Sequence, residues 1–303
     1  MTQIVELEAL KAVRIVLVAP AGPLNVGSVA RVMKNFGLSQ LVLVAPQCEV
    51  LGAEALQMAV HADDILREAK LVDTIPEALV GCEVAIATTA RNRGFDAPLQ
   101  LPEIALPLLL QSVRQSAQID DDTTSSELHS SELHSSESQR GNSALIFGPE
   151  ARGLSNTELT YAQYFTKIPT SDTYSALNLA QAVAVCCYEL YRASEMGASR
   201  NEGVSKYPQA VKESFPLQNS PPSGKQTESS RQSQATLDEL EGYYQHLESV
   251  LLKVEYLYPH TATARMRKVR QLLHRTAPTS NEVALLRGML RQVEWALSDS
   301  NKG

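Results

Sequence analysis

The sequence lacks the features that mark secreted, membrane-spanning and disulfide-rich proteins. Its start has no basic segment leading into an apolar run with a small-residue cleavage site, and no run of about 18 apolar residues occurs. Only four cysteines are present and none has a metal-type spacing, so reduced thiols are expected. These absences predict a cytoplasmic protein with no signal peptide, no membrane span and no metal site.

The common nucleotide-binding fingerprints are absent as well. No predicted strand is followed by G-x-G-x-x-G or by G-x-x-x-x-G-K-[ST]. Hydrophobic residues nevertheless make up 44% of the chain, which is enough for a packed interior and argues against disorder throughout. Because 303 residues are more than one small core needs, we expect one large domain with a smaller one appended.

Negative charge is concentrated in one low-complexity stretch. The net charge of -7 by itself disfavours a nucleic-acid partner. However, six carboxylates and no Lys or Arg lie between Asp120 and Glu137, and without them the net charge is -1. The same stretch repeats SSELH, and serine with carboxylates buries too little surface to offset the entropy of ordering. We therefore expect a disordered insertion at residues 116–142 and assign no metal role to His129 and His134.

Apolar runs predict a parallel sheet in the first 200 residues. Four nearly continuous aliphatic segments have the pattern of strands that are buried on both faces. They begin at Arg14, Leu41, Glu83 and Ser143. Helical patterns occur at residues 26–36, 53–70, 102–114 and 177–193. Residues 1–200 are therefore predicted to form an α/β domain.

A second polar tract separates this region from a helical C-terminal part. Residues 201–235 are rich in Ser, Pro, Gln and Lys, which is typical of a flexible linker. Thr236 and Glu239 then form a capping box that opens an amphipathic helix. The predicted helices cover residues 237–253, 262–275 and 280–297. Residues 236–303 are thus expected to form a small all-α domain.

The middle helix of this part is basic, whereas its neighbours are mixed in charge. Such a run is more often a solvated helix face than a nucleic-acid contact, and both interpretations stay open on the pattern alone. The cations, which are accompanied by no acid, are Arg265, Arg267, Lys268, Arg270 and Arg275.

Three polar, glycine-containing segments follow predicted strands, where open α/β sheets bind ligands. The first is PAGPLNVGSVAR, which contains Asn25 and Arg31. The second is IFGPEARGLSNTEL, with Glu150, and the third is IPTSDTYSALNLAQAV, with Asn178. Each segment alone is explained as well by a tight turn and a helix cap. Their joint occurrence in this order favours a ligand site.

The three segments resemble the three motifs of the SpoU class of S-adenosylmethionine-dependent RNA 2'-O-ribose methyltransferases, over residues 14–192. The C-terminal part is similar to the extension of the bacterial tRNA cytidine/uridine-2'-O-methyltransferases of TrmJ type, which act at nucleotide 32 of the anticodon loop. The resemblance implies a SPOUT fold with a deep C-terminal trefoil knot, a homodimer, S-adenosylmethionine as cofactor and tRNA as substrate. Alternatives left open are 2'-O-methylation of ribosomal RNA and a non-catalytic RNA-binding protein.

The resemblance also assigns site residues by position. The catalytic motif residues fall on Asn25, Arg31, Glu150 and Asn178. The methyl donor is expected against Thr88, Thr89, Ala90, Gly148, Ile168, Ser175, Ala176 and Leu177. In the same framework the five cations of the basic helix become tRNA contacts. In one departure, Ala176 stands where the family usually has Ser before Leu-Asn. Ser175 or Tyr174 would then supply the hydroxyl, or the contact is dispensable.

The transfer chemistry depends on positioning. A sulfonium methyl group is already activated, so its transfer needs an attacking oxygen held in line and neither a metal nor a covalent intermediate. The attacking ribose hydroxyl must lose its proton. The family assigns that step to the arginine found here at Arg31. Because a guanidinium stays charged in proteins, clamping the target phosphate and stabilising the developing alkoxide is an equally physical role.

Overall fold

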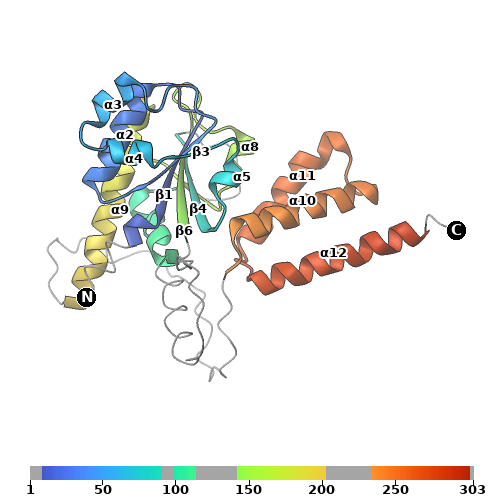
Figure 1. Cartoon of the computed structure of the whole chain (residues 1–303). Helices are drawn as coiled ribbons and strands as arrows, with labels where there is room; N and C mark the ends of the chain where they lie inside the picture. Colours follow the sequence, from blue (N-terminus) through green and yellow to red (C-terminus); the bar gives the residue numbers. More distant parts are fainter. Residues whose placement is uncertain (1–8, 91–98, 114–141, 203–233, 301–303) are drawn as a thin grey trace, which may run out of the picture.

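In the computed structural model, the described residues form a seven-stranded parallel sheet with helices on both faces (Figure 1). The structure describes residues 9–90, 99–113, 142–202 and 234–300. The strand order is β3-β2-β1-β6-β4-β7-β5, and all neighbours are parallel. The strands are β1 Val13–Val18, β2 Gln40–Val44, β3 Lys70–Val72, β4 Cys82–Thr88, β5 Leu99–Gln100, β6 Asn142–Phe147 and β7 Tyr164–Thr166.

Alternate side chains of the central strands face two separate cores. In β1, Ile15 and Leu17 pack on the side covered by α2 and α9, whereas Val16 and Val18 pack on the side of α5 and α8. All four are buried. Strands that are covered on both faces need continuous apolar runs. For this reason the four predicted strands are confirmed as β1, β2, β4 and β6.

The helices are α2 Pro23–Asn35, α3 Ala53–Ala59, α4 Asp63–Arg67, α5 Ile75–Ala78, α6 Pro102–Ala105, α8 Asn156–Leu159, α9 Leu179–Glu202, α10 Leu237–Lys253, α11 Pro259–His274 and α12 Ser280–Ser300. Of these, α2, α9 and the three C-terminal helices lie close to the predicted ranges. A turn at Leu106 separates α6 from a further helical stretch at residues 107–113. The single helical region predicted at residues 53–70 is wrong. The chain breaks at Val60, whose φ of 57° is left-handed and ends α3.

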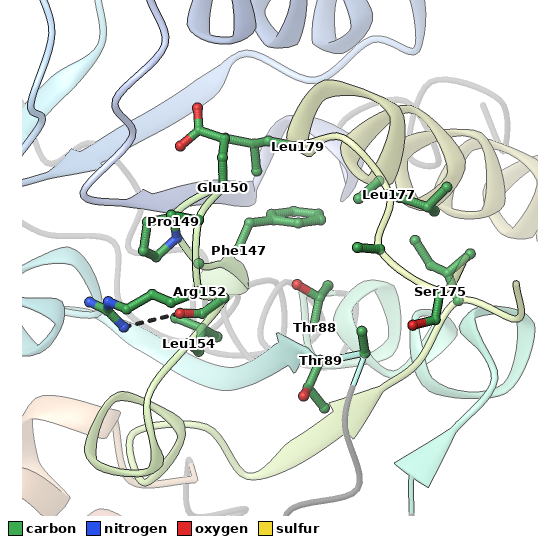
Figure 2. A pocket seen from close by; sticks show the side chains of 17 residues that line it. Thr88, Thr89, Phe147, Pro149, Glu150, Arg152, Leu154, Ser175, Leu177 and Leu179 are labelled. Carbon is green, nitrogen blue, oxygen red and sulfur yellow. Dashed lines mark hydrogen bonds between the residues drawn. The ribbon is translucent and has the colours of Figure 1, made fainter. Parts of the chain in front are cut away.

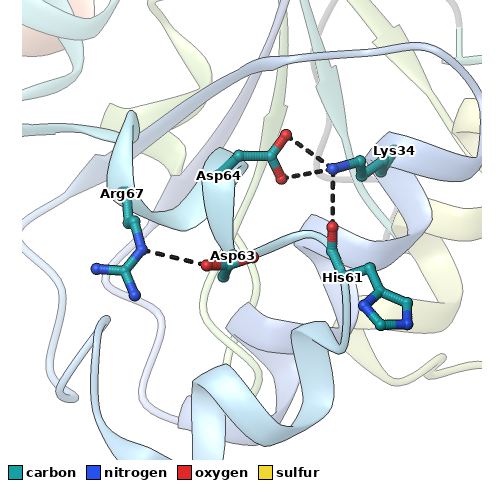
Figure 3. A network of polar contacts seen from close by, with 5 residues as sticks. All are labelled: Lys34, His61, Asp63, Asp64 and Arg67. Carbon is teal, nitrogen blue, oxygen red and sulfur yellow. Dashed lines mark hydrogen bonds and ion pairs between the residues drawn. The ribbon is translucent and has the colours of Figure 1, made fainter.

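A lysine at the end of α2 ties this helix to α4 and to the segment before it (Figure 3). The Nζ atom of Lys34 donates to the carbonyl oxygen of His61 at 2.7 Å and to both carboxylate oxygens of Asp64 at 2.8 Å. The hydrogen bond from Lys34 lowers the pKa of Asp64. Near the other end of α2, a Cβ on Gly27 would overlap the carbonyl oxygen of Ala55. Helices α2 and α3 therefore pack with their backbones in contact.

Helices α10, α11 and α12 form a bundle that packs against the sheet domain (Figure 1). Leu240 and Tyr244 of α10 belong to the same buried cluster as Ile75 and Leu79, which lie beside the sheet. The backbone nitrogen of Gly81 also donates to the carboxylate of Asp238 at 2.8 Å. The bundle and the sheet thus share one apolar core.

Several predictions about domain organisation fall largely outside the described residues. Only Asn142 of the predicted insertion at 116–142 is described, and it begins β6. Of the linker predicted at 201–235, only the ends are described: α9 reaches Glu202, and Ala235 is buried. The division into residues 1–200 and 236–303, like the trefoil knot, stays a prediction. No helix in the described part of the chain is long and apolar enough to span a bilayer.

Candidate active site at the carboxyl ends of the strands

Glu150 brings the first two motif segments together. It follows β6, and its carboxylate accepts hydrogen bonds from the backbone nitrogens of Ala21 and Gly22 in the loop after β1, both at 3.2 Å. The same carboxylate accepts a 2.8 Å hydrogen bond from the amide of Asn25 at the start of α2. Partial burial raises the pKa of Glu150, but these hydrogen bonds outweigh it and the net pKa lies below the usual value.

Asn178 adds the third segment to this network. Its amide nitrogen donates to the side-chain oxygen of Asn25 at 2.9 Å. Its own side-chain oxygen accepts from the backbone nitrogens of Ala180 at 2.9 Å and Gln181 at 3.4 Å, as a residue at a helix N-terminus does. Because β1 and β6 are adjacent and parallel, their carboxyl ends meet at one edge of the sheet. The convergence of the first two motif segments is therefore a direct result of the sheet topology, and the hydrogen bond from Asn178 to Asn25 joins the third segment to them.

A cavity of about 190 Å³ lies beside this network. All eight residues assigned to the methyl donor line it, from Thr88 after β4 to Leu177 before α9. Figure 2 shows Thr88, Thr89 and Ser175 with their side chains around the same space as Phe147 and Leu177. The cavity wall thus contains both hydroxyl groups and apolar side chains.

The loop after β6 forms one wall of the cavity through its backbone. A Cβ added to Gly148 would overlap the backbone nitrogen of Leu154, so the two ends of this loop can touch only with glycine at position 148. Gly153 adopts a φ of 66°, in the left-handed region that favours glycine. The loop therefore depends on two glycines for different reasons, one for close approach and one for its dihedral angle.

An ion pair holds the far side of this loop. Arg152 donates from both terminal nitrogens to the carboxylate of Glu158, at 2.7 and 2.8 Å. Glu158 also completes the predicted capping box, accepting from the backbone nitrogen of Ser155 while its own nitrogen donates to the Ser155 hydroxyl. The hydrogen bond from Arg152, together with those from Ser155, lowers the pKa of Glu158 to about 2. This ion pair links the cavity rim to α8. The sequence predicted the cap formed by Ser155 and Glu158 but not the ion pair.

The fourth motif residue, Arg31, lies apart from the cavity. It is exposed on α2 and is absent from the residues that line the cavity. Of the two candidates for the missing motif hydroxyl, Ser175 lines the cavity, whereas Tyr174 is 81% exposed. Within one chain the structure therefore brings together three of the four predicted motif residues.

The five cations of α11 have different surroundings. Arg270 is only 13% exposed in its side chain, pairs with Glu241 and lies over the ring of Tyr244 at 4.4 Å. Arg265 donates to the carbonyl oxygen of Tyr256 at 2.9 Å, at the turn between α10 and α11. The remaining three, Arg267, Lys268 and Arg275, line a second cavity. Arg270 neutralises the buried carboxylate of Glu241. Its burial therefore does not agree with its predicted role as an RNA contact.

Sequence reasoning missed several lining residues of the first cavity. Phe147, Leu154, Leu179 and Ala182 contribute apolar surface, and Pro149 and Arg152 contribute the rim. All of them lie within four residues of Glu150 or Asn178 along the chain, and this short separation was the available signal. In the described ranges, no group of three or more metal-ligating side chains occurs.

Comparisons with known proteins agree with this geometry. A model of the SpoU rRNA Methylase family matches residues 12–188, and a model of the tRNA methyltransferase TrmJ C-terminal domain matches residues 238–302. The chain is 34% identical over 282 residues to the tRNA (cytidine/uridine/adenosine-2'-O-)-methyltransferase TrmJ of Pseudomonas aeruginosa, covering 93% of both.

Further relatives show the same extent of similarity. The tRNA (cytidine/uridine-2'-O-)-methyltransferase TrmJ of Klebsiella pneumoniae is 33% identical over 97% of this chain and 99% of its own. The crystal structure of TrmJ from Z. mobilis superposes with a TM-score of 0.67 at 28% identity, covering 93% of this chain and 98% of that one. The chain therefore belongs to the SpoU methylase family and, within it, to the TrmJ type.

Proposed function

We propose that this chain is an S-adenosylmethionine-dependent enzyme that methylates the ribose 2'-oxygen of tRNA. The observation that carries the proposal is the hydrogen-bonded network of Glu150, Asn25 and Asn178 beside a cavity lined by all eight expected donor residues. The cavity is lined by residues from three stretches that are far apart in the sequence, 88–90, 147–154 and 168–182.

The cavity residues fit this donor by their chemistry. Leu154, Ile168 and Leu177 provide apolar surface for an adenine ring, and the hydroxyls of Thr88 and Ser175 provide hydrogen-bonding partners for polar groups. Gly148 permits the main chain to pass close to a ligand. When bound, S-adenosylmethionine supplies a methyl group that is already activated on a sulfonium sulfur.

The motif residues of the network act as positioning residues in this proposal. The side-chain amide of Asn25 is engaged on both sides, by the carboxylate of Glu150 and by Asn178. The hydrogen bonds that Glu150 accepts lower its pKa, which makes its carboxylate a weak base. Neither residue is therefore set up to take a proton from the ribose. Their role is to fix the loop after β1 against the donor cavity.

Arg31 is the residue we assign to the RNA side of the reaction. A guanidinium can clamp a phosphate with two hydrogen bonds and stabilise the alkoxide that develops as the 2'-hydroxyl loses its proton. Arg31 shares one face of α2 with Leu24, seven residues before it, which is 49% exposed. The end of α2 lies beside α9, because Phe36, the residue that follows α2, contacts Tyr188 of α9 with ring centroids 6.1 Å apart.

We propose that the face of α2 that carries Leu24 and Arg31, together with the exposed side of α9, forms the interface of a homodimer. Helix α9 exposes Val185 and Tyr188, which are three residues apart and so lie on one side of the helix. Covering these apolar side chains together with Leu24 by a second copy would place Arg31 at the boundary between subunits, near the partner's donor cavity. The dimer would thus complete a site that one chain leaves without its arginine.

The choice of tRNA as substrate rests on the C-terminal bundle and on the names of the relatives. Both relatives described above are tRNA methyltransferases, and their similarity extends through the bundle. Methylation of C or U at nucleotide 32 of the anticodon loop is the finer part of the proposal, as is the trefoil knot. A cytoplasmic location is also proposed, since the four cysteines are free thiols.

One experiment separates this function from its alternatives. The full chain is incubated with labelled S-adenosylmethionine and bulk RNA, and the labelled nucleoside is mapped. Label in tRNA at nucleotide 32 supports the proposal, whereas label confined to ribosomal RNA contradicts the substrate. Calorimetric titration with S-adenosylmethionine is run in parallel. A chain that binds tRNA but not the donor would be a non-catalytic RNA-binding protein.

A further inference from the structure

A second, larger cavity of about 580 Å³ lies between the bundle and the sheet domain. One wall is α11, and the other is the segment from the end of α8 into β7, together with β5 at the sheet edge. We call it the interdomain groove and define it by six lining residues. They are Gln100, Tyr164, Arg267, Lys268, Gln271 and Arg275. The methyl-transfer chemistry does not use it.

The groove carries charge of one sign. Arg267, Gln271 and Arg275 follow at helical spacing on one face of α11, with Lys268 beside them. Among the described residues that line the groove there is no Asp or Glu. Lys268 and Arg275 are exposed, so both can reach a ligand. A concave surface with several cations and no acid attracts a polyanion.

The opposite wall offers groups suited to a nucleobase. Tyr164, the first residue of β7, is 36% exposed and lines the groove. An exposed aromatic ring opposite cations is the arrangement that binds single-stranded nucleic acid, since a base stacks on the ring while its phosphates meet the cations.

We propose that the interdomain groove binds an unpaired segment of the RNA substrate, with its phosphates on Arg267, Lys268 and Arg275 and one base stacked on Tyr164. This inference rests on the proposed function and adds a defined RNA site to it. The cavity volume lies in the range of sites for small ligands, and it fits an unpaired nucleotide better than a duplex. The bundle and the sheet domain would then bind RNA jointly.

The test uses the full chain and a single-stranded RNA decamer, with the blunt duplex of the same sequence as comparison. The groove variant combines Lys268→Glu with Arg275→Glu. The matched control combines Arg287→Glu with Arg291→Glu on α12, two exposed arginines with the same total charge change. We expect the groove variant to bind the decamer about tenfold or more weakly than the wild type. The slope of log affinity against log salt concentration should become shallower by about 1.4, as for two lost phosphate contacts. The control should stay within about threefold.

A second pair of variants tests the stacking. Tyr164→Ala should weaken decamer binding about fivefold or more, and Tyr164→Phe should retain it, because a stacked base needs the ring and not the hydroxyl. Equal losses in the groove variant and the α12 control would overturn the proposal, as would equal affinity for duplex and decamer. A third outcome is also possible: polyglutamate displaces the decamer, and Tyr164→Ala does not change decamer binding. This outcome would overturn the proposal and make the groove a site for acidic peptides.

The two proposals fail separately. If the wild-type chain methylates tRNA and binds S-adenosylmethionine while the groove variant binds the decamer normally, the groove proposal is wrong and the proposed function stands. If decamer binding depends on the groove but no methylation of tRNA is detected, the proposed function is wrong and the RNA site stands.

Discussion

Asn178 and Asn25, 153 positions apart in the chain, share a 2.9 Å hydrogen bond between their side-chain amides. The same Asn25 amide donates to Glu150, so one short network joins the ends of β1 and β6 to the start of α9. Asn178 in addition accepts hydrogen bonds from the first turn of α9. It therefore has two separable functions, capping a helix and orienting Asn25.

Two substitutions at Asn178 separate these functions. Asn178→Ala removes both the cap and the bond to Asn25, and we expect it to cost about 1 kcal/mol of unfolding free energy and to lower the methylation rate. Asn178→Ser keeps a capping oxygen but has no amide to reach Asn25. The urea midpoint of Asn178→Ser should be close to that of the wild type. Its methylation rate should nevertheless be lower than that of the wild type, as in Asn178→Ala. Wild-type activity in the serine variant would show that the bond to Asn25 is unimportant.

Arg31→Lys should impair methyl transfer by about a hundredfold or more, as expected when a group that stabilises developing negative charge is lost. The dissociation constant for S-adenosylmethionine should stay unchanged, because Arg31 does not line the donor cavity. Single-turnover methylation and calorimetry measure the two effects. Arg67→Lys, at another exposed arginine, serves as control. A normal transfer rate in Arg31→Lys would remove Arg31 from the site.

The dimer proposal predicts that Leu24→Asp combined with Tyr188→Asp gives a monomer by light scattering at about 10 μM, since charge at an apolar interface is costly. The wild type should have twice that mass. Leu285→Asp on α12, at another exposed leucine, should leave the mass unchanged. A further readout is complementation: mixing Arg31→Lys with Gly148→Asp should restore activity if Arg31 acts in the partner's site. A monomeric wild type would contradict the proposal.

The stability of the chain should fall on mild acidification because of His274. Burial, reinforced by the charge of Arg270, lowers the pKa of His274 to about 4. The unfolded chain has a histidine pKa of about 6.5, so below that pH the unfolded state binds a proton that the folded state does not. The unfolding free energy should therefore decrease between about pH 6.5 and pH 4, by up to about 3 kcal/mol for this group. Urea unfolding at several pH values measures the unfolding free energy of the wild type and of His274→Gln. If the two free energies changed in parallel with pH, the assignment of the effect to His274 would be contradicted.

The buried ion pair between Glu241 and Arg270 predicts an asymmetric response to substitution. Glu241→Ala leaves a buried guanidinium without its carboxylate and should cost about 3–5 kcal/mol of unfolding free energy. Glu241→Met together with Arg270→Met removes both charges and should cost less than the single substitution. Urea unfolding compares the two. If the double variant were the less stable one, the pair would contribute more than its desolvation costs.

The parts of the fold that could be predicted are those with a strong periodic signal. Strands β1 and β6 are covered on both faces, so burial forces an uninterrupted aliphatic run in each. The convergence of Asn25 and Glu150 follows from the same parallel arrangement, since adjacent strands end at one edge. The bundle was visible through its capping box and amphipathic pattern, and α10 begins one residue after Thr236 as expected.

The parts that could not be predicted depend on tertiary contacts. The break at Val60 requires a left-handed φ in a residue that carries no turn signal. Strand β7 spans three residues and is recognised only by its pairing with β4 and β5. Arg270 has the same local sequence environment as Lys268, yet only Arg270 is buried against Glu241, which lies 29 residues away. A charge pattern along one helix does not indicate which cations will meet a buried acid.

The short helix α8 connects the loop at the rim of the first cavity to the core that the sheet shares with the bundle. Glu158 holds Arg152 at the rim of the donor cavity, while the next residue, Leu159, is buried in the core shared with the bundle. During evolution, exchange of the bundle for a different RNA-binding module would expose Leu159 and disturb the anchor of Arg152. The bundle and the loop after β6 are therefore expected to diversify together between species.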